Sequence, residues 1–397
     1  MSIPKPGPLN GITVIDLTRV LAGPYCSLLL AELGARVIKV EEPDLGDDAR
    51  QYPPMVQGRS GYFASVNRNK ESVALDLKNE EDRRIFEQML KHADVLAENF
   101  RPGVMQKLGY DWETLHERFP KLICVSVSGY GHTGPAAHLP AYDMVMQGVS
   151  GMMSLTGEAD GPPCRAGISI ADSATGMFAA IAVNAALVHR ERTGETTKID
   201  MAMFDCMLSL LETPVNQYLM GDQITHRAGS AHPSIMPFEA FPTADGHVIL
   251  CCGNDRTFRS LCKALGYSDW ADLERFATNV ARVNNRPELF ELIAAVLRTR
   301  STAHWLDYFT RAEVPVSPIN NIAQALQHPQ VAARNMIVEA DDSVQGTSRV
   351  LGSPFKMSAF ADVTTRRIGP ELDQDRAQVF ADFGIVENGG ASKVRSR

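Results

Sequence analysis

The sequence predicts an α/β fold, in which a large, Rossmann-like domain built on a parallel sheet carries a smaller α+β domain. Three observations lead to this prediction. The chain has 397 residues, enough for two domains of roughly 100–200 residues each. Its first half alternates short apolar strands with helices, the pattern of a parallel sheet. Beyond residue 216 the chain becomes rich in Gly, Pro, His and Ser, and the alternation stops.

The first elements make a βαβ unit. Residues 12–17 read as a buried strand, and an Ala-Gly-Pro turn at 22–24 follows it. Residues 25–33 form an apolar helix that ends at a glycine, and residues 36–41 form the next strand. A strand, a helix and a strand within about 30 residues predict parallel pairing.

The alternation continues through the next hundred residues. We expect further strands at 72–77, 94–98 and 122–128 and helices at 80–93 and 111–118. Strands this apolar are covered on both faces, as in doubly wound sheets.

A long helix of small apolar residues is expected at 174–189. It is apolar nearly all round, which is typical of a core helix. Arg190 and Arg192 near its end and Gly194 beyond it suit a helix C-terminus. A strand at 198–201 and a helix at 203–211 follow.

The second domain begins with a loop at 221–237. Two strands around the Asp245-Gly246 turn and helices at 255–265, 286–299 and 302–310 give it an α+β character. The C-terminal 60 residues or so are too short to stand alone, so we expect them to pack on the first domain. The predicted division is 1–215 for the large domain, 216–330 for the small domain with its linkers, and 331–397 for the return.

Composition excludes several classes of partner. The net charge of -8 and the pI of about 5.7 give no reason to expect nucleic-acid binding. Seven cysteines without a CxxC pair predict no metal site. An odd count and an N-terminus without an apolar core predict the cytoplasm. No stretch approaches the roughly 18 apolar residues that span a bilayer, so no membrane is expected.

Motifs of several nucleotide-binding and hydrolytic enzymes are missing. The first strand-to-helix turn, residues 16–24, contains no GxGxxG, and the chain has neither a GxxxxGK[ST] loop nor a GxSxG elbow. We therefore expect no tightly bound nicotinamide, flavin or nucleotide cofactor.

Asp172 is the most informative residue. It stands in AGISIADSATGM (166–177), directly before the apolar helix. One interpretation is a helix N-cap, which aspartate favours. The other is a covalent nucleophile, since a helix N-terminus is expected to lower the pKa of this carboxyl and fix its direction. The local sequence is compatible with both.

Several blocks in order resemble class III CoA-transferases, the family of formyl-CoA:oxalate and carnitine CoA-transferases (the CaiB/BaiF family). The resemblance covers residues 9 to 360 and rests on the Asp172 segment and on LNGITVIDLTRVLAGP (9–24), LGARVIKVE (33–41), NRNKESVALDLK (67–78), ENFRPG (98–103) and SVSGYG (126–131). It implies an interlocked homodimer, with the active site between the large domain of one chain and the small domain of the other.

The resemblance also implies the chemistry. Family members carry a catalytic aspartate at the position of Asp172, which attacks an acyl-CoA to give a mixed anhydride and then an aspartyl-CoA thioester. Coenzyme A and acyl-CoA are substrates, not tightly bound cofactors. CoA contacts are implied at Val20, Leu21, Ala22, Leu75, Lys78, Asn99, Phe100, Arg101, Lys107, Ser128, Gly129 and Tyr130. Lys107 either meets CoA or is a plain surface lysine.

The chain departs from the formyl-CoA transferase pattern at three places. Leu21 replaces a glutamine, Ser128 replaces a lysine, and GSAHPSIMP (229–237) replaces a glycine-rich flap. Oxalate specificity is therefore not expected. His232 in this loop either orients the substrate or is a structural loop histidine.

A related family, the 2-methylacyl-CoA racemases, shares the fold and carries a Gly-His-Asp segment with a histidine base. Here Tyr142 takes the place of that histidine, and a tyrosine is a poor general base at neutral pH. Transfer is therefore favoured over racemisation. A CoA-ester-binding protein without turnover is the alternative of another class.

The acceptor is expected to be a short dicarboxylic acid, with succinyl-CoA as donor. Arg19, Arg50 and Arg165 lie near the expected site in the sequence, and a guanidinium there could clamp the distal carboxylate. Each can equally be a surface ion-pair residue.

Overall fold

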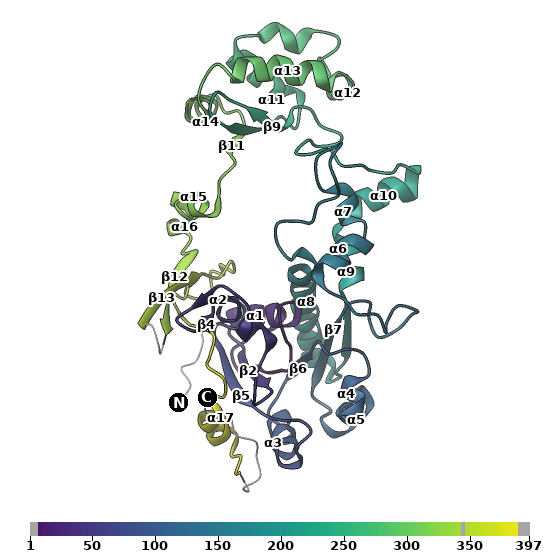
Figure 1. Cartoon of the computed structure of the whole chain (residues 1–397), viewed down its shortest axis with the longest axis vertical. Coiled ribbons are helices and arrows are strands. Elements are labelled where there is room, and N and C mark those ends of the chain that lie inside the picture. The colour runs from purple at the N-terminus through teal and green to yellow at the C-terminus, as the bar shows by residue number, and fades with distance from the viewer. Residues whose placement is uncertain (1–6, 343–345, 388–397) are drawn as a thin grey trace. The chain divides into compact units, whose positions relative to one another are not determined.

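The computed structural model describes residues 7–342 and 346–387. The chain divides into two compact units (Figure 1). Unit 1 consists of Met1–Met153, Arg165–Ile224 and Pro329–Arg397, and unit 2 of Ser154–Cys164 and Thr225–His328. The short segment Ser154–Cys164 thus belongs to unit 2, although the sequence assigned it to the large domain.

Unit 1 is built on a six-stranded sheet with the order β5-β2-β1-β6-β7-β8, in which every pairing is parallel. Numbered along the chain, these strands follow the doubly wound order 3-2-1-4-5-6. The order reverses between β1 and β6. The predicted α/β class and parallel sheet are confirmed, with strands at β1 (Thr13–Asp16), β2 (Arg36–Glu41), β5 (Lys70–Ala74), β6 (Val95–Glu98), β7 (Ile123–Ser128) and β8 (Lys198–Ala202).

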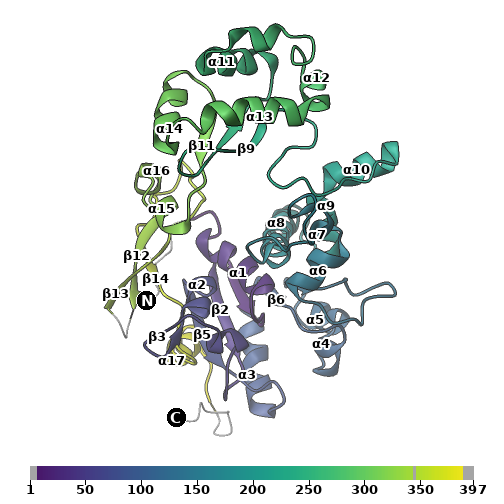
Figure 2. The same ribbon diagram turned by 45° about the horizontal axis from the view of Figure 1, so that its top comes forward.

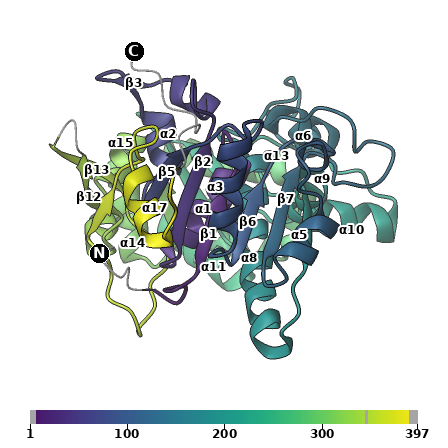
Figure 3. The same ribbon diagram turned by 90° about the horizontal axis from the view of Figure 1, so that it is seen from below.

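Helices cover both faces of this sheet. Alternate residues of a strand face opposite sides, so Val14 packs in one core and Ile15 in the other. The first core contains residues of α1 (Ala22–Glu32) and α8 (Ile170–Thr193). The second contains residues of α3 (Glu80–Leu90), α5 (Trp112–Arg118) and α17 (Arg376–Phe383), the helices drawn in front of the strands in Figure 3.

Helix α8 begins at Ile170, four residues before the predicted start, and has 24 residues. By length and composition alone it could cross a membrane, so the expectation that no stretch approaches such a span is wrong. Half of its apolar window is buried in the structure, and a core helix of this kind meets the same criteria. Its packing against α1 is close, because a Cβ built on Gly176 would lie 2.8 Å from the carbonyl oxygen of Ala22.

The C-terminal return contacts the edge of the parallel sheet. Asp373 accepts a hydrogen bond from the Ala74 amide at 2.7 Å, and Asp375 accepts one from the Ser72 amide at 2.9 Å. These carboxylates satisfy amides of the edge strand β5. The return also forms a three-stranded sheet of order β13-β12-β14, with strands β12 (Ile337–Asp342), β13 (Gly346–Leu351) and β14 (Thr365–Arg367).

The remaining short elements of the first 224 residues lie between these strands and helices or follow β8. They are η1 (Asp48–Gln51), β3 (Met55–Val56), β4 (Arg59–Ser60), α2 (Gly61–Val66), α4 (Val104–Lys107), α6 (Asp143–Val149), α7 (Met152–Leu155), α9 (Met203–Leu210) and α10 (Glu212–Gly221). Near residue 330 the chain forms α15 (Ile322–Leu326) and α16 (Pro329–Ala333).

Unit 2 has its own apolar core around an antiparallel sheet of order β11-β10-β9. The strands β9 (Phe238–Pro242) and β10 (His247–Cys251) pair across the predicted Asp245-Gly246 turn. The other elements, labelled in part in Figure 2, are β11 (Val316–Pro318), α11 (Asp255–Leu265), η2 (Ser268–Asp272), α12 (Asn279–Asn284), α13 (Arg286–Leu297) and α14 (Thr302–Arg311).

Candidate active site

A cavity of about 230 Å³ lies at the carboxyl ends of β1, β6 and β7 in unit 1. This is the point where the strand order reverses, and open α/β sheets bind their ligands there. Its walls come from the loops after the three strands, from the segment before α6 and from the start of α8. The lining residues include Arg19, Val20, Leu21, Ala22, Asn99, Phe100, Arg101, Ser128, Gly129, Tyr142, Asp143 and Asp172.

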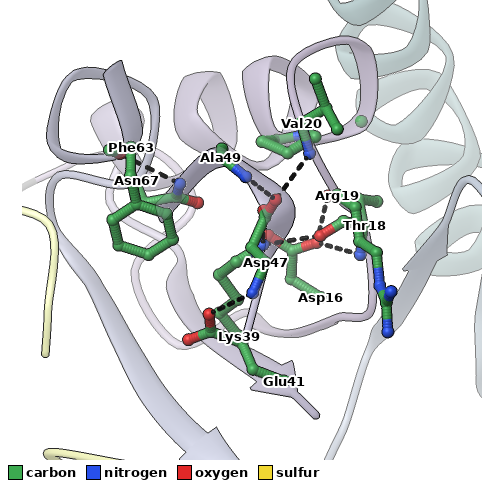
Figure 4. A network of polar contacts seen from close by, with 12 residues as sticks. Asp16, Thr18, Arg19, Val20, Lys39, Glu41, Asp47, Ala49, Phe63 and Asn67 are labelled. Atoms are coloured by element: carbon green, nitrogen blue, oxygen red, sulfur yellow. Dashed lines mark hydrogen bonds and ion pairs between the residues drawn. The ribbon is translucent and has the colours of Figure 1, made fainter. Parts of the chain in front are cut away.

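The loop after β1 has a strained backbone. Val20 has a φ of 68°, which is a left-handed conformation that β-branched residues rarely adopt. Two side chains hold the loop there. Asn99 accepts a hydrogen bond from the Arg19 amide at 2.7 Å. Asp47 accepts one from the Val20 amide at 3.0 Å, which Figure 4 shows. The strain is thus maintained by contacts from two other segments.

Buried charges support this loop from below. The Lys39 ammonium lies 2.9 Å from Asp47 and donates to the Thr18 carbonyl at 2.6 Å. Burial favours the neutral form of Lys39, but Asp47, Asp16 and Glu41 outweigh it and raise its pKa. For Asp47, burial raises the pKa, and the charge of Lys39 and several hydrogen bonds more than reverse this effect. Both groups of the pair are therefore charged at neutral pH.

Asp172 lies in the first turn of α8, as its third residue. It is not the N-cap, because the helix begins three residues earlier than a cap at Asp172 would require. Ser169, the residue directly before the helix, makes no capping hydrogen bond with its side chain. The carboxylate of Asp143 instead accepts the hydrogen bond from the Ala171 amide, at 2.9 Å. A neighbouring helix thus supplies the acceptor that an N-cap side chain normally provides.

The pKa of Asp172 is raised to about 7, chiefly by burial and then by the negative charge of Asp143. The sequence had predicted a lowered pKa from the helix N-terminus. That expectation is wrong because desolvation and a like charge dominate over the helix dipole. At neutral pH the carboxyl is thus only partly ionised, and the ionised form is more basic than an ordinary aspartate.

Asp143 and Gln147 form a buried pair that sequence reasoning missed. The Gln147 amide nitrogen donates to Asp143 at 2.7 Å, and its oxygen accepts from the Ala166 amide at 2.8 Å. Gln147 is fully buried. The Asp-x-x-x-Gln spacing, one turn of α6, was the available indication in the sequence.

Tyr62 is a second residue that the sequence did not indicate. Burial, and then the charge of Asp172, raise its pKa to about 12. Its ring packs edge-on against Tyr52, with 5.5 Å between the centroids. The phenol therefore stays protonated and can donate a hydrogen bond near Asp172.

The cavity brings together eight of the twelve positions implied for CoA. They are Val20, Leu21, Ala22, Asn99, Phe100, Arg101, Ser128 and Gly129. The other four lie elsewhere. Leu75 is 2% exposed in the core beneath α3, so the structure does not support a CoA contact there. Lys78 and Lys107 are exposed, and Tyr130 packs near Phe204 with 6.0 Å between the ring centroids.

Of the five residues expected near the substrate, only two line the cavity. Arg19 and Tyr142 line the cavity. Arg50 does not suit an acceptor clamp, because its guanidinium makes two hydrogen bonds of 2.7 Å to Glu41. Arg165 is exposed and donates to the adjacent Ala166 carbonyl.

His232 belongs to unit 2. Its Nδ1 accepts the Ser234 amide at 3.2 Å, and its ring packs edge-on against Phe238. These contacts fix the position of the histidine ring within its loop. That His232 contacts the substrate stays a prediction. Within residues 7–342 and 346–387, no three His, Cys, Asp or Glu side chains are arranged to hold a metal ion.

Comparison with known proteins identifies the family. The model of CoA-transferase family III matches residues 9–376. The chain belongs to this family. The resemblance seen in the sequence is thereby confirmed, and the chain is a CoA-transferase that uses CoA thioesters as substrates.

Curated relatives and a solved structure agree with this assignment. An acetyl-CoA:oxalate CoA-transferase of Acetobacter aceti is 44% identical over 382 residues, which cover 96% of this chain and 97% of the relative. A succinate–glutarate CoA-transferase of Agrobacterium fabrum is 41% identical, with 96% of each chain covered. A crystal structure of a CaiB/BaiF family protein from Brucella suis has a TM-score of 0.85 and 39% identity, and the match covers 96% of this chain and 100% of that one.

Proposed function

We propose that this family III transferase moves CoA from succinyl-CoA to a short dicarboxylic acid, with Asp172 as the acyl carrier. The observation that carries the proposal is the position of Asp172 in the cavity at the switch point of the sheet, with its pKa raised to about 7. A basic carboxylate in a ligand cavity is a competent nucleophile toward a thioester.

The reaction has two acylations and their reversal. The Asp172 carboxylate attacks the thioester carbon of succinyl-CoA, the C–S bond breaks, and a mixed anhydride and CoA thiolate form. The thiolate attacks the aspartyl carbonyl, which releases succinate and leaves an aspartyl-CoA thioester. The acceptor carboxylate then attacks the same carbonyl, and the released thiolate attacks the acceptor's carbonyl in the new anhydride. Acyl-CoA leaves and the Asp172 carboxylate is restored.

The surroundings of Asp172 suit these steps. Both intermediates hydrolyse if water reaches them, and the apolar walls from Val20, Leu21 and Met203 limit its access. The Tyr62 phenol, with a pKa of about 12, can donate to an oxygen that becomes negative during attack. The strained loop at Val20 is one of the walls along which the pantetheine arm would lie.

Two observations support a dicarboxylic acceptor. Arg19 and Arg101 line the cavity, and each can pair with a carboxylate. The relatives from Acetobacter aceti and Agrobacterium fabrum are named for oxalate, and for succinate and glutarate, which are all dicarboxylates. The first name also reopens oxalate, which the departures at Leu21 and Ser128 had made doubtful.

We further propose that the protein works as a homodimer, with a second copy against the outer side of α8 to α10. Large apolar side chains are exposed there, at 64% for Ile181, 72% for Leu219 and 87% for Met220. An unpaired apolar surface of this kind marks an interface. Light scattering should give twice the chain mass of 43.4 kDa, and a monomer at micromolar concentration would contradict the proposal.

A reducing compartment is consistent with seven free cysteines.

The substrate proposal is tested with succinyl-CoA and a panel of acids. The panel contains C2–C6 dicarboxylates, acetate and carnitine, and mass spectrometry identifies the new CoA esters. We expect CoA esters of the dicarboxylates. Transfer to acetate or carnitine alone would refute the acceptor class, and deuterium exchange at the α-carbon of a 2-methylacyl-CoA without transfer would favour the racemase alternative.

The role of Asp172 is tested separately with Asp172→Ala. This variant should lose transfer while retaining CoA binding, since the other lining residues are unchanged. Retained transfer would refute the mechanism. If neither the wild type nor the variant turns over any acyl-CoA while both bind CoA, the binding-protein alternative holds.

A further inference from the structure

The start of α8 is fixed by a side chain from another helix. Asp143, the first residue of α6, uses one carboxylate oxygen to accept the Ala171 amide at 2.9 Å. Its other oxygen accepts the Gln147 amide nitrogen at 2.7 Å. Because Asp143 is only 9% exposed and Gln147 fully buried, water competes little for these bonds. The backbone that carries Asp172 is therefore attached to α6.

The same contacts determine which oxygen atoms carry protons. The Gln147 oxygen accepts the Ala166 amide, so its nitrogen must face Asp143 as a donor. Both oxygens of Asp143 then accept hydrogen bonds, which suits the ionised carboxylate. Two neighbouring carboxyls rarely both ionise at low dielectric, and the second one holds its proton more strongly. Here that second carboxyl is Asp172, because Asp143 is the better solvated by hydrogen bonds.

We infer that Asp143, oriented by Gln147, is a positioning residue of the transfer reaction: it aims the first turn of α8 and keeps a negative charge beside Asp172 that favours the acylated forms of Asp172 over its free carboxylate. This inference rests on the proposed role of Asp172. The anhydride and the aspartyl thioester carry no charge at Asp172, so acylation relieves the repulsion from Asp143. The more basic carboxylate is also the stronger nucleophile and forms the more stable acyl derivative.

Several titratable and charged groups lie on the elements around α8. Among them, Asp143 is the one described charge that raises the pKa of Asp172, after burial. Tyr62 responds to Asp172 and stays neutral at working pH. The remaining titratable and charged groups on the packed elements and in the cavity are Tyr25, Cys26, Glu32, Cys124, Lys198, Asp200, Asp205, Cys206, Arg19, Arg101 and Tyr142.

The chain offers a variant that moves the charge without losing hydrogen bonds. Asp143→Asn alone keeps the acceptor for Ala171 but turns its amide nitrogen toward the Gln147 nitrogen, so two donors meet. The exchange Asp143→Asn with Gln147→Glu repairs this contact, because the new carboxylate accepts from both the new amide and Ala166. Net charge and hydrogen-bond count are conserved, while the charge retreats one helical turn from Asp172.

The readout is the pH profile of kcat/KM for succinyl-CoA between pH 5 and 9, which reports ionisation of the free enzyme. We expect an acidic limb with a midpoint near 7 in the wild type, since the ionised Asp172 is the reactive form. In Asp143→Asn and in the exchange variant the midpoint should fall by about one pH unit or more. The fraction of enzyme trapped by hydroxylamine as an acyl derivative should also fall at pH 9.

A purely structural role gives a different result. If Asp143→Asn lowers kcat equally at every pH and the exchange variant restores it with an unmoved midpoint, the inference is overturned. The exchange variant should match the wild type in unfolding temperature, which keeps the comparison meaningful if the single variant folds poorly. Asp172→Ala separates the two hypotheses: retained transfer refutes the proposed function, whereas an inactive Asp172→Ala with unmoved midpoints refutes only the role of Asp143.

Discussion

The raised pKa of Asp172 predicts that removing this carboxyl stabilises the protein. The folded state raises the pKa from 3.8 to about 7, so ionising Asp172 is opposed in the folded chain and free in the unfolded one. Each tenfold change in proton affinity corresponds to about 1.4 kcal/mol. The destabilisation is absent below pH 3.8, grows between the two pKa values, and reaches on the order of 4 kcal/mol above pH 7.

Asp172→Asn has no charge to desolvate and should escape this cost. We expect its unfolding temperature in calorimetry to exceed that of the wild type at pH 8, and the gap to narrow at pH 5. Comparing the two pH values removes effects of the amide that do not depend on ionisation. Asp205→Asn is the matched control, because Asp205 also lies in the first turn of a helix, α9, but is exposed. An equal gap at both pH values would show that ionisation of Asp172 does not cause the difference in stability.

Three further substitutions test the support of the loop after β1, the packing of α8 against α1 and the lining of the cavity. Asp47→Ala leaves Lys39 buried without its 2.9 Å partner, which should cost about 3–5 kcal/mol and, in steady-state kinetics, raise KM for succinyl-CoA more than it lowers kcat. Gly176→Ala places a Cβ 2.8 Å from the Ala22 carbonyl, so denaturant unfolding should show a loss of about 1–3 kcal/mol, and unchanged stability would contradict the close packing. Arg19→Gln should lower kcat/KM for dicarboxylates more than for monocarboxylates, and an equal loss for both would exclude Arg19 as the clamp.

The strands of the large sheet could be predicted because local sequence determines them. Continuous apolar runs such as that of β1 are buried on both faces, and turns with glycine or proline separate them from the helices. The predicted ends differ from the observed ones by up to three residues. Which strand neighbours which was not predicted beyond the parallel pairing of βαβ units, since no single strand carries that information.

The start of α8 and the state of Asp172 could not be predicted, because both depend on a residue from another segment. Asp143 lies 28 positions before the amide that it accepts, and nothing near Asp172 indicates its presence. Without this contact, the local sequence left Asp172 open between a helix cap and a nucleophile, and the helix N-terminus was expected to lower its pKa. The geometry reverses the sign of that shift.

The surroundings of Arg50 and Leu75 likewise depend on residues from other segments and could not be predicted from the local sequence. Arg50 looks available in the sequence, but folding brings it against Glu41 from strand β2. Leu75 follows β5 and is turned into the core rather than the cavity. The residues implied at the loops after β1, β6 and β7 line one cavity, because the carboxyl ends of neighbouring parallel strands meet at one edge. That they contact CoA stays a prediction.

The central claim is that Asp172 carries the acyl group and then CoA. Its most direct test is to mix the protein with succinyl-CoA, trap with hydroxylamine, digest and locate the modified residue by mass spectrometry. We expect a hydroxamate on Asp172 in the peptide that contains the first turn of α8, and none in Asp172→Asn. A modification on another residue, or transfer that proceeds in Asp172→Asn, would contradict it.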